Sequence, residues 1–409
     1  MKYVLVIGDG MADNPVPELG NKTPLEYADI PTMDELASKG ELGTVKTVPD
    51  GLVAGSDTAI LSIFGCDPRW CYTGRAPLEV SAEGVKLSPG DAAYRCNMVT
   101  YEDGDIPFEE KRILSHNAGS IEGGESIAII TALFEDPVFK AAAEKAGISV
   151  LKSPSFRHFA MQKNADLTNI KLIPPHDHLG EKIGPLLPSG CDNAKVLKEL
   201  MILAHTILDH HPLNEARRAA GKMPANGIWF WAEGTAVALP NFYENYKKTG
   251  GVVSAVPLCH GIGNLVGLDM ISVEGATGEL ETNLEGKVDA AMEELKDHDF
   301  AAVHYEAPDE CTHNGDLPGK LKAIEYLDRR VVKNLRDQLD AAGYEYRMLI
   351  LSDHKTLTST RGHDGTPVPF LIYDSRKDLN TGMKYSEECG LKGPYIEEGV
   401  TLMARLFEM

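Results

Sequence analysis

The stretch Tyr3-Val-Leu-Val-Ile7, followed directly by Gly8-Asp9-Gly10, decides the fold. Five consecutive apolar residues, most of them β-favouring, predict a short strand that is buried on both faces, and the two glycines predict a tight turn after it. Continuous apolar strands of this kind are typical of parallel sheets that helices cover. Asp9 is therefore expected at the carboxyl end of a buried strand.

The same alternation of strands and helices continues to the other end of the chain. Near the N-terminus the pattern predicts a helix over 32–40, with Thr32 as its capping residue. In the last third we expect strands over 300–305, 348–351 and 368–373, a long amphipathic helix over 319–342 and a closing helix over 395–407. This order predicts an α/β fold: a mostly parallel sheet with helices on both faces.

The length of 409 residues favours two domains, or one domain with a large insertion. The segment 76–244 mixes strand and helix patterns and contains Pro/Gly-rich joints around 172–176 and 184–190. We expect it to form a smaller α+β domain inserted into a discontinuous catalytic domain of residues 1–75 and 245–409. We expect the insertion to bind the substrate.

Composition limits the classes of partner. The formal charge is −21, from 61 acidic and 40 basic residues, which disfavours nucleic acid and anionic membranes. Seven scattered cysteines without a C-x-x-C pair predict reduced thiols, mostly in the core. The N-terminus lacks a signal-peptide pattern and no apolar stretch reaches about 18 residues, so a cytoplasmic location is expected.

Polar clusters follow several of the expected strands. They are Asp9, Asp309 with His313, Asp353 with His354, and His363 in the next loop. An i, i+4 Asp/His pair alone is commonly a surface contact, but ligands of open α/β sheets collect at the carboxyl ends of strands, where these motifs can face one crevice. Carboxylates and imidazoles without cysteine suit Mn²⁺, Mg²⁺, Co²⁺ or Zn²⁺, and six such ligands predict two divalent ions.

Ser56 lies where a loop is expected to become a helix, in Gly55-Ser-Asp-Thr-Ala59. Most serines at this position are ordinary N-caps. Beside a metal site, however, the free amides of a helix N-terminus attract a phosphoryl group and a cation lowers the pKa of the hydroxyl. Ser56 is therefore the candidate nucleophile.

Other motifs are interpreted as structural. The glycines at 8 and 10, and at 261 and 263, do not complete a dinucleotide fingerprint, and Gly286-Lys287 does not belong to a P-loop. Asp209-His210-His211, next to Pro212, is expected to be an exposed helix end rather than a metal site. Trp229 and Trp231 are expected in the core.

The motif set resembles the archaeal-type cofactor-independent phosphoglycerate mutases, a branch of the alkaline phosphatase superfamily, over essentially the whole chain. The matching runs are Gly8-Asp-Gly-Met-Ala-Asp13, Gly55-Ser-Asp-Thr-Ala59, Thr73-Gly-Arg-Ala-Pro-Leu-Glu79, Gly275-Ala-Thr-Gly278, Glu306-Ala-Pro-Asp-Glu310 with His313, Ser352-Asp-His354 and Arg361-Gly-His363. The resemblance implies an alkaline-phosphatase-like fold with an insertion. It also implies a phosphorylated small substrate, phosphoglycerate, and leaves open whether the chain forms a homo-oligomer.

The resemblance also implies the roles of individual residues. One ion would be held by Asp9, Ser56, Asp353 and His354, and the other by Asp309, His313 and His363. Ser56 would take the phosphoryl group of 3-phosphoglycerate and return it to the 2-hydroxyl of the retained glycerate. No nucleotide or bisphosphoglycerate cofactor is then expected.

The substrate contacts depart from the family pattern. Arg157, His158 and Asp177 in the insertion and His260 are the candidate substrate-binding residues. An expected arginine is replaced by Ser120, and His260 stands where Lys or Arg is expected. Lys355 also replaces a glycine often found after the Asp-His pair.

Three alternatives stay open. The first is phosphotransfer to another small alcohol, as in relatives proposed to be homoserine kinases, and the second is phosphomonoester hydrolysis. The third is a non-catalytic phospho-ligand binder, which would require the loss of a ligand or nucleophile, and none is lost.

Overall fold

The computed structural model describes all residues from Met1 to Met409. The chain divides into two compact units: one comprises residues 1–72, 81–83 and 238–409, and the other comprises 73–80 and 84–237. None of the helices combines the length and apolar composition needed to cross a bilayer. All seven cysteines are free, as predicted, and four of them are buried.

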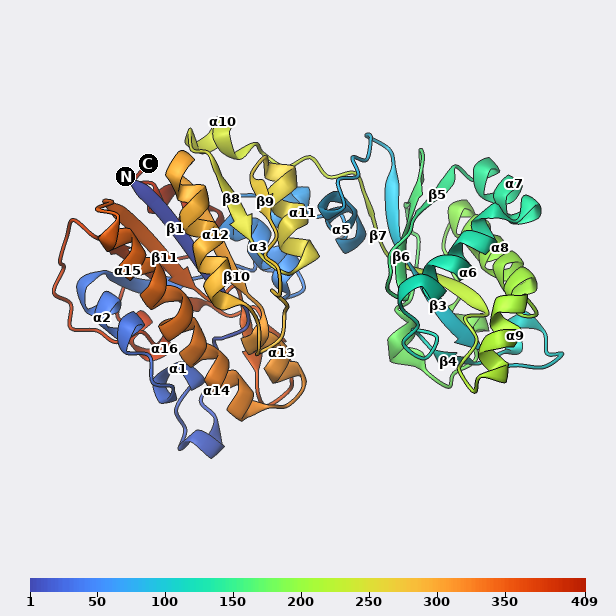
Figure 1. Ribbon diagram of the computed structural model, residues 1–409, viewed down its shortest axis with the longest axis horizontal. Helices are drawn as coiled ribbons and strands as arrows, with labels where there is room; N and C mark the ends of the chain where they lie inside the picture. Colours follow the sequence, from blue (N-terminus) through green and yellow to red (C-terminus); the bar gives the residue numbers. More distant parts are fainter. The chain divides into compact units, whose positions relative to one another are not determined.

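The first unit is built on an eight-stranded sheet (Figure 1). In spatial order its strands are β15 (Tyr395–Ile396), β2 (Glu41–Val45), β14 (Val368–Asp374), β11 (Tyr346–Leu351), β1 (Lys2–Gly8), β10 (Phe300–Tyr305), β8 (Gly250–Val253) and β9 (Asp269–Ile271). β1 pairs in parallel with both β10 and β11. The expected mostly parallel sheet, with β1 at its centre, is confirmed.

Helices cover both faces of this sheet. One face is covered by α2 (Pro31–Lys39), α12 (Leu284–Asp297) and a long helix (Figure 1). The long helix consists of α14 (Leu317–Tyr326), the π-helical turn η5 (Leu327–Val332) and α15 (Lys333–Ala341). These helices share a core with the strand residues Val4, Val6, Val303 and Ile350. On the other, α11 (Pro257–Val266) packs against β8 and against α3 (Ser56–Ile63), and α17 (Leu402–Leu406) packs against β11. The central strands β1, β10 and β11 therefore have no solvent-facing side, which explains their nearly unbroken apolar sequences.

The strand expected over 368–373 is confirmed as β14, which runs antiparallel to β11 and β2 within the mostly parallel sheet. The bounds of two expected helices need correction. The closing helix over 395–407 was too long, because β15 occupies its first residues and pairs with β2, so only 402–406 are α-helical. The long helix begins at Leu317, ends at Ala341 and contains the π-helical turn.

The cap expected for α2 is also wrong. The helix begins at Pro31, and no side chain of the capping residue accepts a hydrogen bond. The carboxylate of Asp328 instead accepts the amides of Thr32 at 3.2 Å and Met33 at 2.6 Å. A residue distant in the sequence thus satisfies amides that a local cap would otherwise take.

The second unit is an antiparallel sheet with helices, as expected for an α+β insertion. Its strands are β3 (Ala92–Tyr101), β4 (Ile113–Ser115), β5 (Ile148–Leu151), β6 (Arg157–Gln162) and β7 (Gly227–Thr235), and β3 pairs with β4, β6 and β7. The core between the sheet and α6 (Gly123–Glu135), α7 (Pro137–Lys145) and α8 (Asp192–Leu208) includes Trp229 and Trp231, as predicted. α9 (Pro212–Ala219) follows α8, and α5 (Arg75–Ala82) spans a boundary between the units.

Candidate metal and phosphotransfer site

The seven residues expected to form the site come together in the first unit. Asp9 follows β1, Ser56 opens α3, and Asp309 and His313 lie one turn apart on α13 (Ala307–His313). Asp353 and His354 follow β11, and His363 lies on β13 (Gly362–Asp364), which forms a hairpin with β12 (Lys355–Leu357). Because β1, β10 and β11 are parallel neighbours, their carboxyl ends meet at one edge of the sheet.

One cluster surrounds the Ser56 hydroxyl. Its Oγ lies 3.2 Å from His354 Nε2 and 3.5 Å from Asp9 Oδ1. Asp353 Oδ2 lies 3.2 Å from the same imidazole nitrogen. The N-cap residue of α3 is Gly55, so Ser56 is the first helical residue rather than the cap, and its side chain is available to the cluster.

The second cluster surrounds Asp309. Its Oδ2 lies 3.1 Å from His313 Nε2, and its Oδ1 lies 3.4 Å from His363 Nε2. His313 Nδ1 lies 2.7 Å from the Arg361 carbonyl oxygen, and His363 Nδ1 lies 3.3 Å from that of Ala54. When each Nδ1–H donates to its carbonyl, each Nε2 faces the carboxylate with a lone pair, the arrangement found around metal-binding imidazoles.

The two clusters adjoin. Ligand atoms of Asp9, Asp309 and His354 all lie within 4.8 Å of one another. The rings of His354 and His363 have centroids 4.3 Å apart. Two metal-sized positions can therefore share one chamber.

Buried carboxylates indicate that the site is built for cations. Asp9, Glu306, Asp309 and Asp353 gather here, and Asp353 Oδ2 and Glu306 Oε2 are buried without a hydrogen-bond partner. Burial, Asp353, Glu306 and Asp309 raise the pKa of Asp9 well above its usual range. Burial and Asp309 raise the pKa of Glu306 to about 7. Two divalent ions carry the positive charge that four carboxylates lack, so the residues fit a dinuclear metal site.

The histidines near Asp309 also have raised pKa values, which in an imidazole favours the charged form. The hydrogen bond and the charge of Asp309 raise the pKa of His313 to about 9, although burial alone would lower it. Burial lowers the pKa of His363, but Asp309 outweighs it and leaves a net increase. Burial would raise the pKa of Asp309, yet His313 and His363 lower it. In the metal-free protein, protons thus occupy positions where a metal would bind.

The sequence did not single out three contacts in this site. His304, near the end of β10, has its Nε2 2.9 Å from Asp9 Oδ2 and its Nδ1 3.2 Å from Ser254 Oγ. Thr356 Oγ1 donates to Asp309 Oδ1 at 2.5 Å. Lys287 is buried, donates to the His304 carbonyl oxygen at 2.9 Å, and has its pKa lowered by burial to about 8. A signal for His304 was present: it is the one polar residue in an otherwise apolar strand sequence.

Of the expected substrate contacts, only His260 lies in this unit. It is on α11, its Nε2 is buried without a hydrogen-bond partner, and burial lowers its pKa. The residue is therefore a neutral imidazole at neutral pH, unlike the Lys or Arg expected in the family. It is available as a hydrogen-bond partner but supplies no fixed positive charge.

The other expected contacts lie in the second unit. Arg157 Nε is buried and unpartnered, and burial, with Arg95 and Arg75 nearby, lowers the pKa of Arg157 to about 10. His158 is fully buried: its Nδ1 accepts the Ser153 amide and its Nε2 contacts Ser126 Oγ. The exposed Asp177 carboxylate lies 3.5 Å from His176. The remaining family departure, Ser120, lies on an exposed loop with a φ of 58°.

Comparison with known proteins now gives the family. Residues 1–393 match the metalloenzyme superfamily. The chain is 43% identical to a 2,3-bisphosphoglycerate-independent phosphoglycerate mutase from Methanosarcina barkeri, over 96% of each chain. It belongs to this family. A relative of the same name from Pyrococcus furiosus is 36% identical over 96% of this chain and 93% of its own.

Solved structures of similar proteins agree with this family assignment. A protein from Pyrococcus horikoshii is 31% identical and superposes with a TM-score of 0.80, over 100% of this chain and 96% of its own. The cofactor-independent phosphoglycerate mutase from Thermoplasma acidophilum shares the fold at 24% identity, with a TM-score of 0.65 and coverage of 100% and 99%. As a member of the phosphoglycerate mutase family within the metalloenzyme superfamily, the chain is a metal-using enzyme.

Proposed function

We propose that the protein interconverts 3-phosphoglycerate and 2-phosphoglycerate through a phosphoserine at Ser56, without bisphosphoglycerate or a nucleotide. The observation that carries the proposal is the position of Ser56 Oγ, 3.2 Å from His354 Nε2 and 3.5 Å from Asp9 Oδ1, on the first residue of a helix. The full-length similarity to mutases that carry this name supports the substrate.

The chain's own residues would hold two divalent ions. We assign Asp9, Ser56, Asp353 and His354 to one ion, and Asp309, His313 and His363 to the other. When bound, these ions would supply Lewis-acid activation of the serine hydroxyl and positive charge for the phosphoryl oxygens. Mn²⁺, Mg²⁺, Co²⁺ and Zn²⁺ all suit the oxygen and imidazole donors.

In the first half-reaction, Ser56 Oγ attacks the phosphorus of 3-phosphoglycerate. The bond between phosphorus and the substrate's O3 breaks, the serine loses its proton, and O3 gains one to become the hydroxyl of glycerate. The start of α3, which is the positive end of its helix dipole, favours the negatively charged phosphoryl group on Ser56. The 2-hydroxyl of the retained glycerate then attacks the phosphoserine, which returns the serine hydroxyl and yields 2-phosphoglycerate.

The substrate carboxylate needs a cation, and the second unit offers one. Arg75, Arg95 and Arg157 lie close enough to influence one another, and the Glu79 carboxylate is held by Arg75 and Arg95. Arg157 keeps an unpartnered, buried Nε. We therefore propose Arg157 as the carboxylate-binding residue, through the planar fork that lysine lacks. His158, whose ring nitrogens are both engaged, is a poorer candidate than Arg157.

An enolase-coupled assay tests the proposal. Metal-depleted protein should be inactive with 3-phosphoglycerate and should regain activity with Mn²⁺, without added nucleotide or bisphosphoglycerate. Parallel reactions should measure phosphate release and the phosphorylation of homoserine by ATP. No mutase activity together with phosphohomoserine formation would favour the kinase-like alternative, and rapid phosphate release alone would favour a phosphatase.

A further inference from the structure

Three side chains that can bind a metal ion meet at the edge of the large sheet opposite to the catalytic site. Asp269 is the first residue of β9, Glu294 lies in the last turn of α12, and His298 follows α12 directly, shortly before β10 begins. β8, β9 and β10 are parallel. The catalytic residues follow the carboxyl ends of the central strands, whereas Asp269 and His298 lie at the amino ends of β9 and β10.

The three side chains surround one point. One ligand atom from each residue lies within 4.8 Å of the ligand atoms of the other two. His298 Nε2 lies 3.8 Å from Glu294 Oε1 and 3.9 Å from Asp269 Oδ2. Both separations are too long for a hydrogen bond. The imidazole and the two carboxylates therefore face one another across a gap, as the ligands of an ion do.

Glu294 supplies a buried oxygen to this gap. The side chain is 12% exposed, and its Oε1 is buried without a hydrogen-bond partner. Burial raises the pKa of Glu294; His298 opposes this shift, and the charges of Asp269 and Asp297 add to it. A buried carboxylate oxygen without a donor is unfavourable, and a cation bound beside it would stabilise the charged form.

Gly251 in β8 leaves space for this carboxylate. It pairs with Asp269 of the neighbouring strand. A Cβ atom at position 251 would lie 3.0 Å from Glu294 Oε1 and 3.1 Å from the Asp269 carbonyl oxygen. Because glycine has no side chain, the Glu294 carboxylate can lie against the sheet beside Asp269.

No basic side chain neutralises the two carboxylates. The ion-pair contacts of Asp269 and Glu294 are made with His298, and neither carboxylate pairs with a lysine or an arginine. Lys2 is close, but its Nζ donates to the backbone carbonyl oxygen of His298 at 2.9 Å. The negative charge of this group is therefore available to a bound cation.

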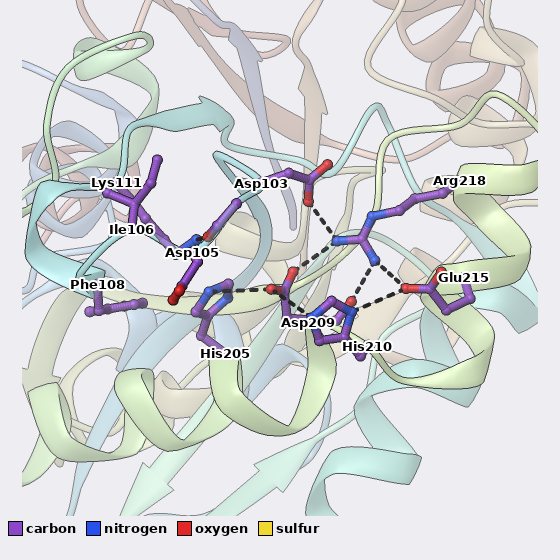
Figure 2. Close-up of a pocket in the computed structure, with 11 residues that line it drawn as sticks. Asp103, Asp105, Ile106, Phe108, Lys111, His205, Asp209, His210, Glu215 and Arg218 are labelled. Atoms are coloured by element: carbon purple, nitrogen blue, oxygen red, sulfur yellow. Dashed lines mark hydrogen bonds and ion pairs between the residues drawn. The ribbon is translucent and has the colours of Figure 1, made fainter.

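A pocket of the second unit shows the contrasting case (Figure 2). This 620 Å³ pocket also brings histidines and carboxylates together. Its carboxylates already share the guanidinium of Arg218, and they belong to Asp103, Asp209 and Glu215. A cation of the protein itself therefore occupies the place that is free beside Glu294.

We propose that Asp269, Glu294 and His298 bind one divalent transition-metal ion, separate from the ions of the catalytic site. Each carboxylate would provide an oxygen and His298 its Nε2, and water would complete the coordination. The imidazole favours an ion such as Zn²⁺ over Mg²⁺ or Ca²⁺, which prefer oxygen ligands. The ion would connect the edge strand β9 to α12 and to the segment that leads into β10.

The distances suit such an ion after a small movement. With bonds of about 2.0–2.2 Å, two ligands of a tetrahedral zinc ion are about 3.4 Å apart. The separations of 3.8 and 3.9 Å therefore have to shorten by about half an ångström. The Asp269 side chain is 68% exposed and the His298 side chain 34% exposed, so both can make this movement.

The test is the zinc stoichiometry of the full-length protein, measured by equilibrium dialysis against Zn²⁺ and elemental analysis. Wild type should hold one zinc ion more per chain than Asp269→Asn, Glu294→Gln and His298→Ala. The affinity of each variant for this ion should fall at least about tenfold, since losing even a partner that orients a ligand weakens binding by about 10–100-fold. Mutase activity with Mn²⁺ should be unchanged in Asp269→Asn, because the catalytic site lies at the other edge of the sheet.

Two control variants locate the extra ion. Glu293→Gln removes the neighbouring carboxylate of α12, which pairs with Lys296, and therefore tests for an effect of charge alone. His210→Ala removes an exposed imidazole that faces the Asp209 carboxylate in the second unit. Both controls should retain the extra zinc, and unfolding curves of the metal-free proteins check that every variant is folded. The proposal is overturned if folded Asp269→Asn and Glu294→Gln hold as much zinc as wild type, or if either control loses the same ion.

Discussion

Replacing His304 with phenylalanine should weaken metal binding at Asp9 while leaving the fold intact. The His304 ring is fully buried between two partners: its Nε2–H donates to Asp9 Oδ2 at 2.9 Å, and its Nδ1 accepts from Ser254 Oγ at 3.2 Å. The Val256 amide in turn donates to Ser254 Oγ, at 3.0 Å. This series of hydrogen bonds fixes Asp9 Oδ2 and leaves Asp9 Oδ1 facing Ser56.

The expected magnitude follows from the contact that is lost. A hydrogen bond to a charged group is worth about 1.5–3 kcal/mol, or roughly a tenfold to hundredfold change in an equilibrium constant. Loss of partners that orient metal ligands typically weakens metal affinity by about 10–100-fold. We therefore expect His304→Phe to raise the apparent dissociation constant of the ion at Asp9 by about this factor, with a smaller fall in kcat at saturating metal.

The assay is a Mn²⁺ titration of metal-depleted protein, followed by mutase activity and by the free Mn²⁺ signal in electron paramagnetic resonance. His304→Gln is the matched control, since its amide can still donate to Asp9, and it should recover most of the affinity. Unfolding curves of the metal-free variants separate a folding defect from a binding defect. Wild-type metal affinity in a folded His304→Phe protein would refute the reasoning.

Four further predictions concern the catalytic site and the fold. Ser56→Ala should abolish mutase activity, and the phosphopeptide that contains Ser56 should no longer be found after an acid quench. The metal content, measured by elemental analysis, should stay within one ion of wild type. Normal turnover in this variant would refute Ser56 as the nucleophile. Arg157→Lys should raise KM for phosphoglycerate about tenfold with kcat little changed, because an ammonium group cannot bind a carboxylate through two parallel hydrogen bonds. An unchanged KM in steady-state kinetics would count against a contact between Arg157 and the substrate carboxylate. Asp309 raises the pKa of His313 to about 9, so protons compete with metal below that pH. The apparent metal affinity should therefore increase from pH 6 to pH 9 and level off above pH 9. Isothermal titrations that show no such increase would contradict this prediction. Asp328→Ala should lower the free energy of unfolding, measured in urea, by about 1–3 kcal/mol, because the amides of Thr32 and Met33 lose their acceptor. An unchanged urea midpoint would indicate that water replaces the Asp328 carboxylate.

The sequence predicted the centre of the fold because its signal is local. β1, β10 and β11 are short apolar runs, and an apolar run ending in a polar residue indicates a buried strand and the residue at its carboxyl end. The direction of β14 could not be predicted in the same way, since a buried strand reads alike in both orientations. The cap of α2 was missed because Asp328 belongs to a distant segment.

The candidate site was predictable to the same extent. Residues that follow strands, such as Asp9 and Asp353, could be placed at one edge once the sheet was assumed parallel. The contacts made by residues within strands or in the hairpin could not be predicted in this way. His304 stands out as the one polar residue of an apolar strand, but the sequence does not show that it contacts Asp9, and Thr356 reaches Asp309 only because of the β12–β13 hairpin. Tertiary structure, rather than local pattern, decides these contacts.

The balance of charge in the site links its stability to metal binding. Asp9 and Glu306 have raised pKa values because burial and neighbouring carboxylates disfavour their charged forms. The metal-free protein can hold these groups together by binding protons, but divalent ions at the same positions neutralise the charge without protonating the ligands. The surrounding parallel strands are fully buried, so the sheet provides the packing that keeps the carboxylates close before any ion binds. Metal uptake should therefore release protons rather than fold the unit, and proton release at constant secondary structure is the signature that distinguishes a preformed site from one that the metal organises.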